Sequence, residues 1–155
     1  YVVIAAGSAP DRLEKRWPSD KYGRLAKLIH GLGYQPVLIG TIAELGVNQT
    51  IKKICPEALD LTAQTTLFDI VSLGREAAGC IGNDTGPMHM MAPTGSPCLV
   101  LFSKHSNPVR HAPKGQNVEV LTRENLKDLK SEEVLNHFKP KQDSISVSKK
   151  SKTMH

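Results

Sequence analysis

Residue types and patterns that mark several common classes of protein are scarce in this sequence. Aromatic residues make up 5% of its 155 residues, and there are three cysteines, Cys55, Cys80 and Cys98. An odd number of cysteines with no C-x-x-C pair argues against a disulfide framework and a zinc ribbon, and it indicates a reducing compartment. Cys80 and Cys98 lie in apolar segments, so we expect them to be buried as small hydrophobic side chains.

Neither a membrane span nor a secretory leader is evident. No apolar run approaches the roughly 18 residues that a membrane-spanning helix needs. The sequence opens at Tyr1 directly into an apolar segment, without a preceding basic stretch or an initiator methionine. We therefore interpret the sequence as one domain taken from a longer chain.

Most of the positive charge lies at the C-terminal end. The formal net charge is +5, and residues 139–155 hold five lysines and one aspartate, a net of +4, which leaves +1 for residues 1–138. Residues 1–138 are the expected folded domain, and residues 139–155 are expected to form a disordered basic tail. Such a tail could contact an anionic membrane surface weakly or simply be solvated. Nucleic acid is not an expected partner, because no aromatic residues are interleaved with the lysines.

Short β-rich apolar segments alternate with helical periodicity along the chain. The first helix is expected from Ser19 to Leu32, with Ser19 as its N-cap and Gly33 as its stop, and Thr66 is expected to cap a later helix. Helices are also expected over 44–54, 87–93 and 129–138, and Pro93 should shorten the second of these. Strands are expected at Val2–Ala6, Pro36–Ile39, Ala58–Leu61, Gly79–Ile81, Cys98–Phe102 and Val118–Leu121.

This alternation predicts an α/β fold with a doubly wound, Rossmann-like parallel sheet, because strands separated by single helices need crossover connections. Ligands of such sheets bind beyond the carboxyl ends of the strands, where the strand order reverses. The loops after the first, second, fourth and fifth strands are therefore the ones to inspect.

The strongest local pattern is Gly82-Asn83-Asp84-Thr85-Gly86-Pro87-Met88-His89, which follows an apolar strand and opens a helix. The free N–H groups and dipole of a helix N-terminus favour phosphate, and Gly86 allows a close approach to the backbone. Thr85 adds a hydroxyl donor, and His89 could donate to the same ligand. Asp84 would repel phosphate, so a sugar hydroxyl or nearby N–H groups suit it better. The alternative is an ordinary capped helix with a satisfied histidine.

Two other loops carry candidate ligand contacts. In the loop from Gly7 to Pro18, Ser8 can donate to phosphate and Lys15 or Arg16 can neutralise it. An ordinary surface loop is the alternative there, since neither a dinucleotide fingerprint nor a P-loop is present. Glu44, after the second strand, suits a ribose diol or, alternatively, the first turn of a helix. We expect no metal site, because there is no D-x-D pair and the histidines lack the spacing of metal ligands. Trp17 is expected to be a packing anchor.

Three segments together resemble glycosyltransferase family 9, whose best-known members are the ADP-heptose:lipopolysaccharide heptosyltransferases. They are Lys15-Arg16-Trp17-Pro18, Gly40 through Glu44 and, most specifically, the D-[ST]-G-x-x-H element Asp84-Thr85-Gly86-Pro87-Met88-His89. The resemblance runs from residue 1 to about residue 121. It implies a GT-B architecture of two Rossmann-like halves, of which this sequence is similar to the C-terminal, donor-binding half.

The resemblance also implies roles for individual residues. Lys15 is similar to the lysine that stabilises the departing diphosphate, and Ser8 to a residue contacting donor phosphate. Glu44 resembles the acid at the nucleoside ribose. The remaining donor-binding positions are Thr65 and Thr66, which lie in the segment that passes the adenine, and Asp84, Thr85, Gly86 and His89, which match the element holding phosphates and sugar.

The reaction implied by the resemblance is inverting sugar transfer without a metal or other cofactor. The donor would be a nucleotide-sugar, with ADP-heptose the expected one, and a glycolipid acceptor and the general base would be held by the absent N-terminal half. The fragment alone should be inactive. The resemblance also implies a cytoplasmic location. An alternative is a peripheral position at the inner face of the bacterial inner membrane. A non-catalytic nucleotide- or sugar-phosphate-binding module is the alternative function.

Overall fold

A six-stranded parallel sheet forms the centre of the molecule. The computed structural model describes residues 1–7, 16–103 and 112–141. In it the strand order is β3-β2-β1-β4-β5-β6, and every neighbouring pair is parallel. The doubly wound α/β fold expected from the sequence is thereby confirmed. The strands are β1 (Val2–Ala5), β2 (Pro36–Leu38), β3 (Leu59–Asp60), β4 (Gly79–Asn83), β5 (Cys98–Ser103) and β6 (Val118–Arg123).

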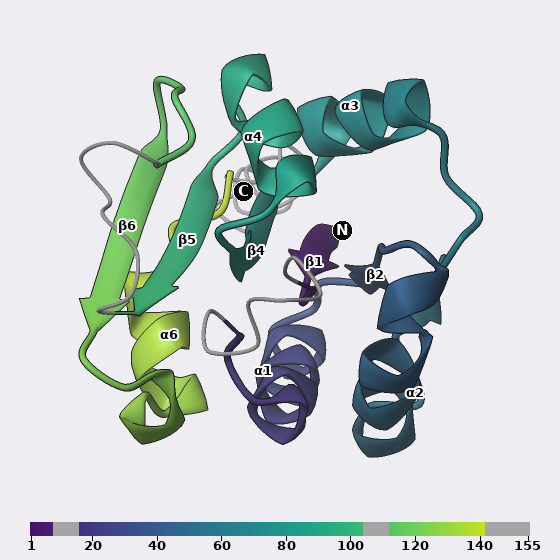
Figure 1. Cartoon of the computed structure of the whole chain (residues 1–155), viewed down its shortest axis with the longest axis vertical. Coiled ribbons are helices and arrows are strands. Elements are labelled where there is room, and N and C mark those ends of the chain that lie inside the picture. Colours follow the sequence, from purple (N-terminus) through teal and green to yellow (C-terminus); the bar gives the residue numbers. More distant parts are fainter. Residues whose placement is uncertain (8–15, 104–111, 142–155) are drawn as a thin grey trace, which may run out of the picture.

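Helices cover both faces of this sheet (Figure 1). One face carries α1 (Ser19–Gly31), α2 (Leu45–Ile54) and α6 (Ser131–His137), and the other carries α3 (Leu67–Glu76) and α4 (Gly86–Met91). Short 3₁₀ turns adjoin them at Ile42–Glu44, Ala92–Thr94 and Leu126–Asp128. This arrangement explains why β1, β2, β4 and β5 are buried along their whole length, since helices cover both faces of the sheet at these strands.

The two faces of the sheet have separate hydrophobic cores. Val2 and Ile4 of β1 pack with the α1, α2 and α6 layer, whereas Val3 and Ala5 pack with α3 and α4. The alternation follows from the strand pleat, which points successive side chains to opposite faces. Cys80 and Cys98 are buried in the second core as free thiols, as the sequence predicted.

The N-cap predicted for α1 and the start predicted for the last helix were wrong. The helix α1 begins at Ser19, as predicted, but Pro18, not Ser19, is its N-cap, and no side chain caps this end. The reason is that the Pro18 carbonyl already accepts the first helical hydrogen bonds, from the backbone N–H groups of Lys21 and Tyr22. The last helix begins at Ser131 and not at residue 129, because Leu129 is extended after a 3₁₀ turn.

Other boundaries moved by a few residues. The segment expected as one helix over 87–93 is α4 followed by the 3₁₀ turn Ala92–Thr94, since Pro93 has no N–H to continue an α-helix. The second helix starts at Leu45, after a 3₁₀ turn capped by the Thr41 hydroxyl. The caps at Thr66 and Gly33 were predicted correctly, and Gly33 has a φ of 96°, which favours glycine.

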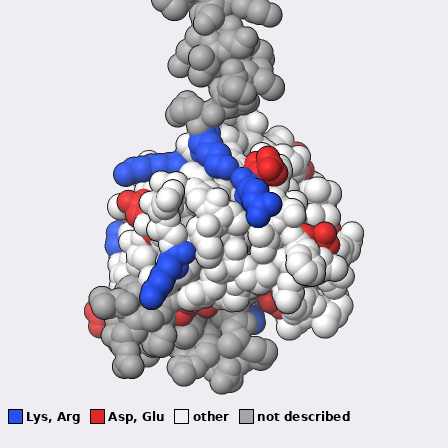
Figure 2. Space-filling model, turned by 90° about the horizontal axis from the view of Figure 1, so that it is seen from above, with Lys and Arg blue, Asp and Glu red and all other residues white. Residues whose placement is uncertain are grey.

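The described chain remains attached to the domain as far as Lys141. Its backbone N–H donates to the Ala78 carbonyl over 2.8 Å. Most of the expected tail, residues 142–155, lies outside the described residues. Figure 2 shows the α3 and α4 side of the molecule, where uncharged side chains occupy most of the described surface. Among the described residues, no helix is long and apolar enough to cross a membrane.

Candidate ligand-binding site at the β1–β4 switch point

The strand order reverses between β1 and β4, and the crevice beyond their carboxyl ends is the candidate site. The chain leaves β1 toward α1 on one face of the sheet and leaves β4 toward α4 on the other. The two connections therefore diverge to opposite faces of the sheet, which is the arrangement at which doubly wound sheets bind their ligands. Gly7 and Arg16 are the described ends of the first connection, and Asp84 and Thr85 form the second.

Asn83, the last residue of β4, holds the two connections together. Its Nδ2 donates to the carbonyl oxygens of Ala6 and Gly7 over 3.0 and 3.2 Å. Its Oδ1 accepts from the Trp17 backbone N–H at 3.2 Å and the Tyr22 hydroxyl at 2.9 Å. No role was predicted for Asn83. The available signal was an amide side chain at the end of an apolar strand, because buried polar groups are almost always hydrogen-bonded.

Asp84 and His89 lie together at the start of α4. The His89 Nε2 is 3.1 Å from Asp84 Oδ1, and only 9% of the Asp84 side chain is exposed, against 46% for His89. The sequence predicted both residues at the ligand edge but not their contact with each other. The pairing turns Asp84 away from bulk solvent and presents the more exposed imidazole at the edge.

The helix start between them was predicted with Pro87 in its first turn, and the structure confirms it. Thr85 is the N-cap, but its hydroxyl does not cap the helix. Instead Thr85 Oγ1 is buried and has no hydrogen-bond partner among the described residues. Gly86 is exposed, and a Cβ atom added there would meet no other atom within 4 Å. The backbone at Gly86 is therefore open to a ligand.

Glu44 also lies at this edge, against the end of β1. A Cβ atom on Gly7 would lie 2.5 Å from Glu44 Cγ, so only glycine lets this side chain approach. The Thr41 hydroxyl donates to Glu44 Oε2 over 2.8 Å. Glu44 also forms the N-cap of α2. Both interpretations of Glu44, as a residue at the ligand edge and as an acid favoured by a helix N-terminus, fit this position.

Thr65 and Thr66 lie between the end of β3 and the start of α3. The Thr66 hydroxyl accepts from the Asp69 backbone N–H at 3.1 Å, and the Thr66 N–H donates to Asp69 Oδ2 at 2.8 Å. This capping box lowers the pKa of Asp69, chiefly through the backbone hydrogen bond. Thr65 lines a hollow of about 400 Å³ together with Tyr1, Leu61 and residues of α3. Within the part of the chain that the structure describes, neither threonine is hydrogen-bonded to the Asp84 turn.

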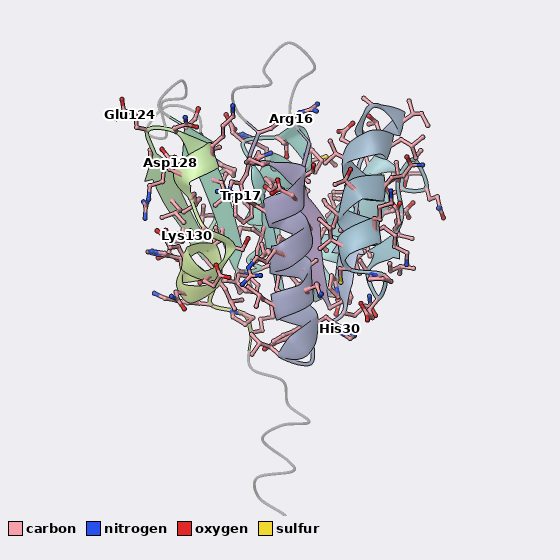
Figure 3. All side chains as sticks on the ribbon, turned by 90° about the horizontal axis from the view of Figure 1, so that it is seen from below. Arg16, Trp17, His30, Glu124, Asp128 and Lys130 are labelled. Atoms are coloured by element: carbon pink, nitrogen blue, oxygen red, sulfur yellow. The ribbon has the colours of Figure 1, made fainter. Side chains whose placement is uncertain are left out.

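Two further candidates, Ser8 and Lys15, lie outside the described residues. The segment that follows them is well anchored. Trp17 is 1% exposed, its Nε1 donates to the Leu129 carbonyl over 2.9 Å, and its ring meets Tyr22 edge-to-face at 4.7 Å. The prediction of a packing anchor is confirmed. Figure 3 shows Arg16 at the edge where the strands end and His30 at the opposite edge.

Burial raises the pKa of Tyr22 well above its ordinary value, so this hydroxyl stays protonated and can donate to Asn83. Among the described residues, no three histidine, cysteine, aspartate or glutamate side chains are grouped so that they could hold a metal ion.

These features define a Rossmann-like α/β domain with polar side chains at the edge where its strands end. A family model then places the domain more narrowly. It matches residues 1–141, and the chain belongs to glycosyltransferase family 9, the heptosyltransferase family. The matched region extends beyond residue 121, where the resemblance seen in the sequence ended.

Individual relatives agree with this assignment. The chain is 31% identical over 97 residues to lipooligosaccharide heptosyltransferase 2 of Haemophilus influenzae, which is 59% of this chain and 28% of that protein. It is 33% identical over 98 residues to lipopolysaccharide heptosyltransferase 2 of Escherichia coli, again 59% of this chain and 28% of that protein. The chain therefore matches less than a third of the length of these curated relatives.

Two solved structures share the fold. The E. coli ADP-heptose lps heptosyltransferase II superposes with a TM-score of 0.79 at 25% identity, covering 87% of this chain and 44% of that one. The E. coli heptosyltransferase WaaC with ADP gives a TM-score of 0.77 at 19% identity, covering 88% and 42%. The second likeness shows the fold alone. Both relatives are more than twice as long as the part that corresponds to this chain.

Proposed function

We propose that this chain is the donor-binding half of a heptosyltransferase and binds a nucleotide-sugar, ADP-heptose, at the β1–β4 crevice. The observation that carries the proposal is the Asp84–His89 turn, which follows β4 at the switch point of a family 9 domain. Solved relatives contain ADP and ADP-2-deoxy-2-fluoro heptose, which supports an adenine nucleotide as the donor carrier.

The proposed roles are those that the family resemblance implies, and the contacts of the described residues support some of them. Lys15 and Ser8 would contact the diphosphate from the β1 side, where Lys15 neutralises charge that grows on the leaving group. On the β4 side, the Thr85 hydroxyl has no partner among the described residues and can donate to a ligand oxygen. His89 and Asp84 would hold the transferred sugar, with Gly86 leaving room for it.

The nucleoside would extend toward β2 and β3. Glu44 lies against Gly7 and offers carboxylate oxygens suited to a ribose diol. Thr65 and Thr66 would flank the base, with Thr66 acting through the end of the helix that it caps.

In the proposed reaction, the acceptor hydroxyl loses its proton to a base outside this chain and attacks the anomeric carbon of the sugar. The bond from that carbon to the diphosphate oxygen breaks on the opposite face, so the configuration inverts, and the nucleoside diphosphate leaves. No metal is required, because Lys15 and backbone N–H groups stabilise the departing charge. The acceptor is a glycolipid of the lipopolysaccharide core, bound by the other half of the enzyme, and a cytoplasmic location belongs to the same proposal.

Calorimetric titration of the 155-residue chain with ADP, UDP and GDP tests the donor. We expect ADP to bind most tightly and the chain alone to transfer no sugar from ADP-heptose to acceptor. A clear preference for UDP would contradict the ADP assignment, and turnover by the isolated chain would show that the base lies within it.

A further inference from the structure

We propose that Asn83 is a positioning residue that fixes both stems of the β1–α1 connection relative to the Asp84–His89 turn. The stems are Ala6–Gly7, where the chain leaves β1, and Trp17, where it enters α1. The ligand in this inference is taken from the proposed function, but the contacts that carry it are independent of that function.

The donor side of the Asn83 amide extends the link between β1 and β4. The parallel ladder between these strands ends with Ala5 opposite Gly82. Beyond that pair, Asn83 Nδ2 donates to two consecutive carbonyls, those of Ala6 and Gly7. The Asn83 side chain therefore replaces backbone pairing at the point where the segments that follow β1 and β4 diverge.

The acceptor side secures the second stem. Asn83 Oδ1 accepts from the Trp17 backbone N–H and the Tyr22 hydroxyl, while the Trp17 indole is itself bonded to Leu129. Because a backbone N–H can only donate and a carbonyl can only accept, the orientation of the amide is determined by its partners. Both stems and β4 are thus joined through one side chain.

Asn83 is fully buried, so it acts through its neighbours and does not touch a ligand itself. All of its amide N–H groups and both oxygen lone pairs have partners, which no other side chain of this size could satisfy. Asp84 is the next residue in the chain. A shift of Asn83 would move the Asp84 turn and both stems relative to one another, and with them the groups proposed to contact the diphosphate.

The test compares the two sides of the amide. Asn83→Asp keeps an acceptor for Trp17 and Tyr22 but loses the donors to Ala6 and Gly7. Tyr22→Phe is the matched control, because it removes one buried hydrogen bond from the same Oδ1 and leaves both stem contacts in place. Each variant is titrated with ADP by calorimetry in the full chain, and its thermal unfolding is measured in parallel.

We expect Asn83→Asp to bind ADP about tenfold or more weakly, whereas Tyr22→Phe loses thermal stability but keeps ADP affinity within about twofold. Equal affinity of Asn83→Asp and the unchanged chain would overturn the inference. So would an equal loss of affinity in both variants, since that would follow from general destabilisation.

A second measurement needs no ligand. In Asn83→Ala the Trp17 amide loses its acceptor, so its hydrogen exchange should become about tenfold faster or more, while amides in the middle of α1 keep their protection. If the Trp17 amide of Asn83→Ala exchanges as slowly as in the unchanged chain, Asn83 does not hold this stem, whether or not ADP binds. If the unchanged chain does not bind ADP but the Trp17 amide of Asn83→Ala exchanges fast, the proposed function is contradicted. The positioning role of Asn83 is then still supported.

Discussion

Three consecutive residues at the end of β4 have side chains in three different environments. Asn83 points into the protein, Asp84 pairs with His89 across the first turn of α4, and the Thr85 hydroxyl is buried without a partner among the described residues. This short turn therefore combines a side chain that bonds to neighbouring segments, an aspartate–histidine contact and a buried hydroxyl without a partner among the described residues. Substitutions at neighbouring positions should accordingly affect different properties.

Asp84→Asn is expected to lower stability modestly and to leave ADP affinity unchanged or slightly higher. The change weakens the contact with His89, typically by about 1 kcal/mol, but removes a negative charge near the proposed phosphate site. Recognition of the sugar should worsen. Titrations with ADP and with ADP-heptose check this, and Asp20→Asn, an exposed acid in the first turn of α1, is the control. If ADP binding falls as steeply as sugar-nucleotide binding, Asp84 is a scaffold for the turn.

Lys15→Ala is expected to weaken ADP binding by about 1.5–3 kcal/mol, the usual contribution of a charge-assisted hydrogen bond. In the full-length enzyme turnover should fall further than donor affinity, because leaving-group charge grows in the transition state. Lys53→Ala is the matched control, since Lys53 is exposed in the last turn of α2, away from the ligand edge. An equal effect of both substitutions would show that Lys15 contributes only to the general charge of the protein.

The start of helix α3 is stabilised by residues of its own first turn. Thr66 and Asp69 satisfy each other's backbone N–H groups in a capping box, and the preceding Ala63 adopts a φ of 59°. A left-handed alanine is uncommon and signals a loop held by its surroundings. Its N–H donates to the Gly40 carbonyl over 2.8 Å, which ties this loop to the end of β2.

The capping box predicts a pH dependence. Because the fold lowers the pKa of Asp69 below its ordinary value of about 3.9, its stabilising effect is complete above that value and is lost as the pH falls through the lowered pKa. Asp69→Asn should therefore reduce the free energy of unfolding at pH 7, and the difference should shrink toward pH 3. Chemical denaturation at several pH values measures it.

Thr66→Ala provides the control for that experiment, with an expected cost of about 0.5–2 kcal/mol from the lost N-cap. When Thr66→Ala is already present, adding Asp69→Asn should lower the free energy of unfolding by little more, since the Thr66 hydroxyl of the capping box is already absent. A cost of Asp69→Asn that stays constant from pH 7 to pH 3 would mean that charge is not the cause.

At the scale of the whole molecule, the parallel sheet brings the ends of β1, β2 and β4 to one edge. Glu44 lies against Gly7, and Asn83 joins the same strand end to the α4 turn. These contacts assemble one continuous polar edge from residues that are distant in the chain. The proposed ligand would extend along it from the sugar at β4 to the nucleoside at β2.

ADP binding by the whole chain is expected not to need a divalent cation. The proposed diphosphate site uses Lys15 and backbone N–H groups to neutralise charge, which makes a bridging metal unnecessary. Titrations with EDTA and with added magnesium should give the same affinity within about twofold. Affinity that disappears with EDTA and returns with magnesium would reveal a metal site.

The sequence alone determined the fold class and the edge at which to look for a ligand. Apolar runs alternating with helical periodicity indicated parallel strands, and the Asp84–His89 pattern marked the turn after the fourth strand. The cap at Thr66 and the stop at Gly33 were also predictable, because they depend on residues within a few positions of one another. Ser19 was a wrong cap because the Pro18 carbonyl already accepts the first helical hydrogen bonds, which places Ser19 inside the helix.

Only the tertiary structure decided which polar groups meet. Asn83 contacts Trp17 across 66 positions of the sequence and Gly7 across 76, and no local periodicity encodes such pairs. The position of Glu44 on Gly7 likewise depends on β2 lying beside β1. Strand order sets these distances, and strand order results from burying both faces of the sheet at once. The sequence therefore determined the elements and their polar ends, while packing decided how those ends combine into a site.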